Sequence, residues 1–205
     1  KTKDRDRNGN ETTYTYDVQN RLTRVTHPDS TYIEYAYDDN GNQTSVRDEN
    51  NKYTYYTYDD LNRVTQVTDA NNHVTQTSYD ANGNVLTVTD ASSHTVSYEY
   101  DKLNRLTKIT YPDSSYEQFA YDAAGNKTSW RKQDGNTVQY AYNDANLLAT
   151  IDYPSGTDTT FTYNGRAQRT QMVDAAGTTG YTYDSAGRLS TVTDVHGKTI
   201  TYSYN

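Results

Sequence analysis

A Tyr-Asp or Tyr-Asn pair recurs ten times along the 205 residues, and its fixed period limits what the chain can fold into. Eight of the nine intervals between successive pairs are 21 residues and one is 20. A constant period of this size is typical of arrays in which each repeat is one supersecondary unit. We therefore expect residues 1–205 to form a single array of ten repeats, as a segment of a longer array or assembly. The ten anchor pairs are Tyr16 with Asp17, Tyr37 with Asp38, Tyr58 with Asp59, Tyr79 with Asp80, Tyr100 with Asp101, Tyr121 with Asp122, Tyr142 with Asn143, Tyr163 with Asn164, Tyr183 with Asp184, and Tyr204 with Asn205.

Each repeat alternates in a way that predicts two β-strands. An aromatic residue lies two positions before the anchor Tyr in nine of ten repeats, and period two places both rings on one face of a strand. An apolar residue always lies nine positions after the anchor Tyr, preceded by a polar one such as Gln66, Thr87, Lys108 or Thr150. We expect the polar neighbours to point outward and the apolar residues to form a buried core at Val25, Val46, Val67, Val88, Ile109, Trp130, Ile151, Met172 and Val192.

The fourth position after each anchor Tyr predicts a reversal of the chain. It holds Gly or Asn, which tolerate a left-handed backbone, in every repeat but the one with Ala167. Those turn residues are Asn20, Gly41, Asn62, Gly83, Asn104, Gly125, Asn146 and Gly187. Asn-Arg and Gly-Asn turns alternate over the first six repeats, so the structural unit is expected to be a 42-residue pair. One Asp per turn is best explained by Asx-type hydrogen bonding to the following backbone.

The composition favours an all-β fold with a thin core. Only 32% of residues are hydrophobic, but 23 are Tyr, whose ring packs while its hydroxyl stays in contact with water or hydrogen-bonded. Thr, Val, Tyr and Ile suit a pleated, half-buried surface. The net charge of −8 disfavours nucleic acid and anionic membrane surfaces as partners, and no apolar stretch is long enough for a membrane span. The fold predicted is an array of tandem β-hairpins in a solenoid-like sheet.

Two segments give the repeat a family likeness. Tyr183 to Ser190 reads Tyr-Asp-Ser-Ala-Gly-Arg-Leu-Ser, and Tyr100 to Thr107 reads Tyr-Asp-Lys-Leu-Asn-Arg-Leu-Thr. They resemble the repeat of the RHS/YD-repeat family, roughly Tyr-Asp-x-x-Gly-Arg-Leu-Thr. The resemblance implies a coiled β-ribbon that forms the wall of bacterial toxin shells or of teneurin barrels, in an extracellular or secretion-associated protein. Toxin-type members end their shell in a motif with self-cleaving aspartates; no segment here resembles it, so self-cleavage is not implied.

No residue pattern indicates catalysis, a metal or a cofactor. The four histidines, His27, His73, His94 and His196, lie in second turns separated by whole repeats, which is not ligand spacing. Asp4 to Asn10 resembles the start of a calcium loop, but Thr15 occupies the position of the required bidentate Glu, and a hairpin turn is the better interpretation.

The expected function is therefore architectural rather than enzymatic. We expect a structural module of a secreted or cell-surface protein, in the wall of a shell, tube or fibre. A self-assembling extracellular filament subunit is the first alternative, and a carbohydrate-binding adhesive module that uses the tyrosine rings is the second. The expected partners are further repeats of the same chain, or other copies, at open sheet edges. An encapsulated polypeptide or a surface glycan would be additional partners.

Overall fold

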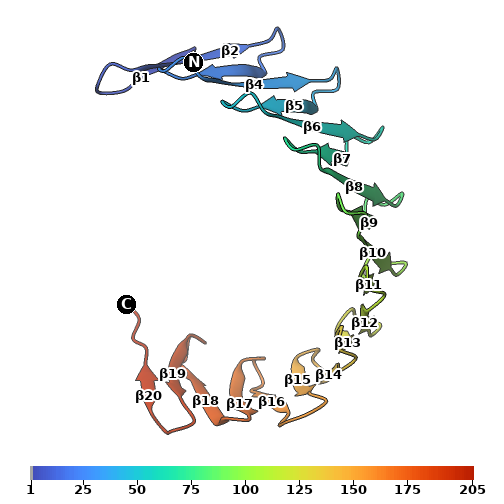
Figure 1. Cartoon of the computed structure of the whole chain (residues 1–205). Coiled ribbons are helices and arrows are strands. Elements are labelled where there is room, and N and C mark those ends of the chain that lie inside the picture. The colour runs from blue at the N-terminus through green and yellow to red at the C-terminus, as the bar shows by residue number, and fades with distance from the viewer. Residues whose placement is uncertain (1) are drawn as a thin grey trace. The chain divides into compact units, whose positions relative to one another are not determined.

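The computed structural model describes residues 2–205, and this part of the chain contains β-strands and turns but no helix (Figure 1). No helix long and apolar enough to cross a membrane is found among these residues. The chain divides into two compact units, residues 1–98 and residues 99–205. Within each unit consecutive strands lie side by side and pair antiparallel, which agrees with the all-β hairpin array expected from the sequence (Figure 1).

Each repeat contributes two strands of three to seven residues. In the first unit they are β1 (Lys3–Arg5), β2 (Glu11–Tyr16), β3 (Leu22–Thr26), β4 (Tyr32–Tyr37), β5 (Gln43–Arg47), β6 (Tyr53–Tyr58), β7 (Val64–Thr68), β8 (Val74–Tyr79) and β9 (Val85–Thr89). Strand β10 (Thr95–Tyr100) crosses the boundary. In the second unit they are β11 (Leu106–Thr110), β12 (Tyr116–Tyr121), β13 (Lys127–Arg131), β14 (Thr137–Tyr142), β15 (Leu148–Asp152), β16 (Thr159–Tyr163), β17 (Arg169–Asp174), β18 (Gly177–Tyr183), β19 (Leu189–Thr193) and β20 (Thr199–Thr201).

A β-bulge precedes the anchor Tyr in each of eight hairpins. In β2 and β3, Tyr16 lies opposite Leu22 while Thr15 lies opposite Arg24, so one residue of β3 is extra. A bulge leaves one residue out of the ladder and increases the local twist of the pair. The alternation in the sequence does not predict it, because the register shift is set by the geometry of the turn.

The pairing sorts side chains onto two faces, which we call the anchor face and the polar face. The anchor face carries the anchor Tyr, the aromatic two residues before it and the apolar residue nine after it. The last two are cross-strand neighbours, as in Tyr35 with Val46 and Phe119 with Trp130. The polar face carries the residues between them, mostly Thr, Ser, Gln and charged residues; in β2 to β6 it includes Thr15, Arg24, Glu34, Ala36, Ser45, Arg47, Tyr53 and Tyr55.

The core is thinner than the sequence suggests. The nine apolar positions expected in it are each half-buried rather than buried: Val25, Val46, Val67, Val88, Ile109, Trp130, Ile151, Met172 and Val192. Their polar neighbours Gln66, Thr87, Lys108 and Thr150 are half-buried too, so burial does not separate the two faces. The reason is that each strand of residues 2–205 contacts only the strands next to it in the sheet, so neighbouring side chains shield each other but no second layer covers them. Among the described residues, the one buried apolar side chain is Val138, at 2% exposure, opposite Trp130.

Candidate functional site

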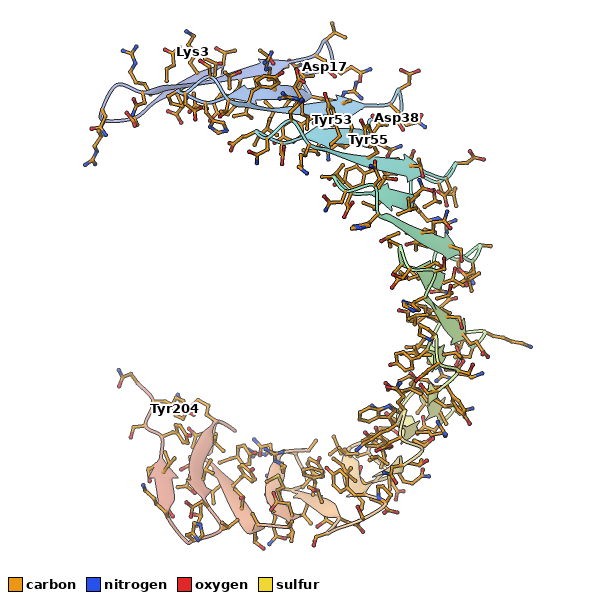
Figure 2. All side chains as sticks on the ribbon, in the orientation of Figure 1. Lys3, Asp17, Asp38, Tyr53, Tyr55 and Tyr204 are labelled. Carbon is orange, nitrogen blue, oxygen red and sulfur yellow. The ribbon has the colours of Figure 1, made fainter. Side chains whose placement is uncertain are left out.

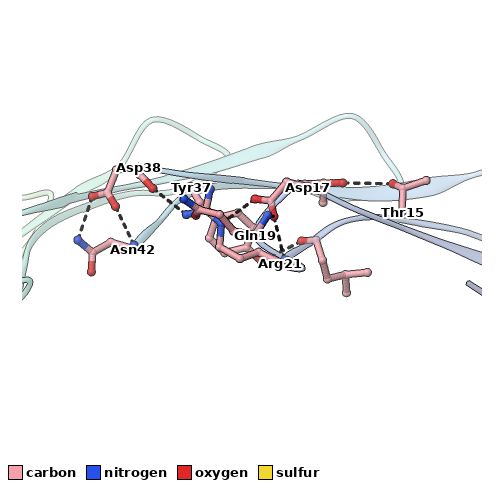
Figure 3. Close-up of polar contacts among 9 residues, drawn as sticks. Thr15, Asp17, Gln19, Arg21, Tyr37, Asp38 and Asn42 are labelled. Carbon is pink, nitrogen blue, oxygen red and sulfur yellow. Dashed lines mark hydrogen bonds and ion pairs between the residues drawn. The ribbon is translucent and has the colours of Figure 1, made fainter. Parts of the chain in front are cut away.

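The Asp of each anchor pair organises the turn that follows it. In the first such turn the Asp17 amide donates to the Arg21 carbonyl at 3.0 Å, and Asn20 closes the reversal with a φ of 61°. The Asp17 carboxylate accepts from the amides of Gln19 and Arg21, both at 2.9 Å, through Oδ1 (Figure 3). The Asn20 amide also donates to the Asp17 carbonyl at 3.1 Å, so the turn has a left-handed last residue and a carboxylate that takes the place of a backbone acceptor.

These hydrogen bonds lower the pKa of the anchor carboxyls. Hydrogen bonds from the Arg21 backbone lower the pKa of Asp17, and the Asn42 side-chain amide has the same effect on the pKa of Asp38. The pKa values of Asp59, Asp80, Asp101, Asp122 and Asp184 are lowered for the same reasons. Where Asn replaces Asp, as at Asn143, its Oδ1 still accepts from the amides of Ala145 and Leu147, both at 3.0 Å.

The anchor Tyr reaches back to the preceding repeat. The Tyr37 hydroxyl donates to the Leu22 carbonyl at 2.9 Å. The ladder between β3 and β4 begins only at Arg24, so Leu22 lies beyond its end, and the hydroxyl supplies the donor that the ladder does not. Seven further anchors make the equivalent bond, at 2.7 to 3.0 Å: Tyr58 to Gln43, Tyr79 to Val64, Tyr121 to Leu106, Tyr142 to Lys127, Tyr163 to Leu148, Tyr183 to Arg169 and Tyr204 to Leu189.

An Arg in every second turn of the first six repeats ties that turn to the next anchor pair. Arg21 Nε donates to Asp17 Oδ2 at 2.6 Å, and its Nη1 donates to the Asp38 carbonyl at 2.7 Å (Figure 3). The same guanidinium lies 4.8 Å from the centre of the Tyr37 ring. We call this arrangement the arginine staple. It recurs at Arg63 with Tyr79 and Asp80, and at Arg105 with Tyr121 and Asp122.

The intervening turns use Asn in the same role. Asn42 Nδ2 donates to Asp38 in its own turn and to Asn62 Oδ1 in the next turn, at 2.9 and 2.7 Å. Asn126 makes the same link to Asn146 at 3.3 Å. The alternation of Arg and Asn in the sequence therefore corresponds to two kinds of link between successive turns. Leu147 occupies an arginine position but has no polar side chain, so this link is missing from its turn.

The second turns reuse the carboxylate device. Asp6 accepts from the amides of Asn8 and Asn10 at 2.8 and 2.9 Å, so the segment that resembles a calcium loop is a hairpin turn between β1 and β2. Asp48, Asp69, Asp90 and Asp194 accept in the same pattern. His73 and His94 pair with Asp69 and Asp90 through Nδ1, at 3.0 and 3.1 Å. These histidines belong to separate turns.

Of the predicted residues, the structure places the turn positions at a left-handed backbone. Asn20, Asn62, Asn104 and Asn146 have φ values of 57° to 61°, and Gly41, Gly83, Gly125 and Gly187 have φ values of 82° to 93°. The sequence predicts neither a role for the staple arginines nor the acceptors of the tyrosine hydroxyls. A signal existed for the first, in the alternating Asn-Arg and Gly-Asn turns. The acceptors of the tyrosine hydroxyls leave no signal in the sequence, because they are backbone carbonyls and every residue type has one.

Chemically, this arrangement holds neighbouring stretches of backbone together. The carboxylates accept from turn amides, the guanidiniums lie on rings, and the hydroxyls donate to carbonyls. Burial raises the pKa of Tyr37, Tyr58 and Tyr142, so these phenols stay protonated donors at neutral pH. Across residues 2–205 no group of three or more His, Cys, Asp or Glu side chains is placed to hold a metal ion.

Comparison with solved structures gives the same fold in parts of much larger chains. TcdB2-TccC3 without its hypervariable C-terminal region aligns over 89% of this chain and 13% of that chain, with a TM-score of 0.54 and 17% identity. TcdB2-TccC3 aligns over 99% and 14%, with a TM-score of 0.53 and 14% identity. The Tc holotoxin pore of Photorhabdus luminescens aligns over 91% and 12%, with a TM-score of 0.56 and 14% identity. The chain thus spans less than a sixth of each.

The family comparison covers nearly the whole array. No curated protein matches the chain. The model of the RHS Repeat family matches residues 2–32, 37–74, 79–116, 121–158, 142–179, 161–199 and 183–205. These matches follow the strands and turns described above, and the likeness stated from the sequence is confirmed. The chain belongs to the RHS repeat family.

Proposed function

We propose that this chain is a non-catalytic wall segment of a secreted or cell-surface protein, in which the repeats enclose or support other polypeptide. The observation that carries the proposal is the repeated use of one device. The carboxylate of the anchor Asp binds the amides of its own turn, and the anchor Tyr and the staple residue join neighbouring repeats. A segment whose recurrent polar side chains are hydrogen-bonded to its own backbone is suited to an architectural role.

The structural relatives add support of a different kind. Two of the titles name TcdB2-TccC3, and the third names a Tc holotoxin pore. The last title names a toxin, and this chain shares the fold of these structures over most of its length. A wall role and a location outside the cell are therefore proposed for the protein that contains these repeats. Fractionation of the source cells, with an antibody to this segment, would locate it.

Deletion of whole repeats tests the architectural proposal. Removing residues 38–79 joins Tyr37 to Asp80 and preserves the alternation of Arg and Asn turns. We expect this variant to fold, with the same hydrogen-exchange protection in its remaining strands, because each repeat contacts chiefly its neighbours. Collapse of the whole chain after this deletion would contradict a modular wall.

A matched deletion gives the control. Removing residues 59–79 joins Tyr58 to Asp80, so Asn42 faces Gly83 instead of Asn62 and the staple of Arg63 is lost. We expect this shorter deletion to be the more destabilising of the two. The order would reverse if repeat number, rather than the pattern of links, determined stability.

A further inference from the structure

The polar face of the first unit contains a hollow that the repeat architecture does not require. Its volume is about 420 Å³, within the range of small-molecule sites, and its lining extends from β2 to β6. Four long side chains form one row across neighbouring strands. Arg24 lies opposite Glu34, Glu34 lies opposite Arg47, and Arg47 lies opposite Tyr53. This row forms one side of the hollow.

The hollow exists because the adjoining row is short. Ala36 and Ser45 are cross-strand partners on the same face and also line it. At its far end the hydroxyls of Thr15 and Thr23 are 3.2 Å apart. Small and hydroxylated side chains beside arginine and tyrosine leave a depression with polar groups on its floor. All of these residues belong to the first unit.

Both guanidiniums are held in place by one ring. The Cζ atoms of Arg24 and Arg47 lie 3.4 and 3.9 Å from the centre of the Tyr32 ring. Arg47 Nε also donates to Asn51 Oδ1 at 2.7 Å. Stacking on a ring fixes the plane of a guanidinium, so less side-chain entropy is lost when an anion binds to it.

The positive charge in the hollow is only partly balanced. Glu34 is the one acidic residue among its lining, against two arginines. The nearest approach of Glu34 Oε1 to Arg24 is 3.9 Å, at Nη1, which is too long for a hydrogen bond. The Nε of Arg24 is covered by protein atoms and has no hydrogen-bond partner among the described residues, although 38% of the whole side chain is exposed, so its Nη groups are the donors that face solvent. In a chain of net charge −8, the hollow is therefore a locally cationic site lined by the guanidiniums of Arg24 and Arg47.

One exposed tyrosine ring, that of Tyr53, lines the hollow, and a second, that of Tyr55, stacks on it. Tyr53 and Tyr55 lie next to each other on β6, with ring centres 5.6 Å apart and planes 7° from parallel (Figure 2). Their exposures are 38% and 49%. An apolar flat surface beside a cationic one is chemically suited to a ligand that has both a flat ring and a negative charge.

A second copy of the frame, 84 residues later, separates structural from specific features. Arg131 and Lys108 lie over the Tyr116 ring, at 3.8 and 5.3 Å from its centre, as Arg47 and Arg24 lie over Tyr32. The cation-on-tyrosine stack therefore belongs to the repeat. The second copy has Lys108 in place of Arg24, Glu99 in place of Thr15 and Phe119 in place of Tyr35. It also has Gln118 in place of Glu34, Thr137 in place of Tyr53 and Gln139 in place of Tyr55. The exposed rings are particular to the first unit.

We propose that the hollow on β2 to β6 binds a small organic anion in which a carboxylate is attached to a flat ring. The carboxylate accepts hydrogen bonds from Arg24 and Arg47, and the ring lies against Tyr53. An aromatic acid has this chemistry, and an acidic sugar unit offers the same carboxylate with the apolar C–H face of its ring in place of the flat ring. This site is independent of the architectural role, since neither Arg24 nor Arg47 belongs to a staple.

NMR titration of the intact chain tests the site. Benzoate and glucuronate are the two probes, and benzamide is the uncharged control. We expect one of the two acids to shift amide signals of β3 to β6 and the Nε–H signals of Arg24 and Arg47, and the acid that binds identifies the source. Benzamide should shift none of them. Equal shifts with benzamide, no shift with either acid, or equally strong binding of inorganic sulfate would overturn the proposal.

Four variants assign the binding to the named residues. R47Q removes one charge-assisted donor and should weaken binding roughly tenfold or more. E34Q removes the competing carboxylate and should tighten binding, a gain that a folding defect cannot imitate. R131Q, at the equivalent place in the second unit, should leave affinity unchanged. Replacing Tyr53 and Tyr55 with the Thr and Gln of the second unit should reduce the affinity for the acid to the affinity for acetate, which has the carboxylate but no ring. Weakening by R131Q equal to that by R47Q would show a general charge effect and refute the site.

Discussion

Removing the hydroxyl of one anchor tyrosine measures what the link between repeats contributes. In Tyr79→Phe the ring remains beside Arg63, 4.5 Å from its guanidinium, and only the donor to the Val64 carbonyl at 2.8 Å is lost. The carbonyl is part-buried and lies beyond the end of its ladder, so water replaces the hydroxyl incompletely. A hydrogen bond of this kind contributes about 1 kcal/mol, and leaving its acceptor unsatisfied costs about 1–3 kcal/mol. We expect a loss of about 1 kcal/mol in this half-buried setting.

The assay has to resolve a local effect, because a long repeat array departs from two-state unfolding. Native-state hydrogen exchange of the amides in β7 to β9 reports the opening free energy of those hairpins directly. A global melt would show a shift of roughly 2–4 °C for a chain of this size if the array unfolds as one.

Tyr56→Phe is the matched control. Tyr56 lies two residues before an anchor, on the same face and opposite Val67, and its hydroxyl has no hydrogen-bond partner among the described residues. Removal of that hydroxyl should change the opening free energy by no more than about 0.5 kcal/mol. Equal effects of the two substitutions would refute the assignment of the anchor hydroxyl as a link between repeats.

Three further perturbations follow from the same contacts. Leu147→Arg combined with Asn143→Asp installs the missing staple and should raise the stability of the β14 to β16 region by about 0.5–1 kcal/mol, measured by hydrogen exchange; no gain would mean that the staple is incidental. Gly83→Ala, at a φ of +92°, should cost about 1–3 kcal/mol in chemical denaturation, while Gly165→Ala, in open space with no such φ, should be near neutral. The anchor carboxyls have folded-state pKa values below their ordinary 3.8, so their contribution is present above that value and is lost as the pH falls through the lowered ones. Circular dichroism during acid titration should show unfolding in that window, and Asp59→Asn should reduce its pH dependence.

The repeat and its two strands could be predicted because they depend on periodicity, and periodicity survives in a single sequence. The turn positions could be predicted for a related reason: Gly41 and Asn62 both adopt a left-handed backbone, and few residues tolerate one. The degree of burial could not. Alternation at Gln66 and Val67 predicts which residues share a face, but whether that face is covered depends on a second layer.

The links between repeats were hidden for two physical reasons. The acceptor of the Tyr37 hydroxyl is a backbone carbonyl, and any residue at position 22 would supply it. The register that brings the two together also depends on the bulge before Tyr16, which inserts one residue without a composition signal. The staple differs, since Arg21 and Asn42 alternate visibly. Its geometry explains an alternation that the sequence shows without a cause.

That geometry also explains why the array is built in pairs. Arg21 spans the interval to the next turn with a long side chain and binds a backbone carbonyl, whereas Asn42 is short and has to meet another side chain, Asn62. An Asn turn therefore requires Asn at the reversal of the following turn, and an Arg turn does not. Gly at the reversal after an arginine turn is compatible with the guanidinium, which lies 3.9 Å from the Cβ position of Gly83. Because each link constrains only the next turn, stability accumulates locally along the chain. An array with this property can be lengthened by 42 residues without a new fold, as a wall of variable extent requires.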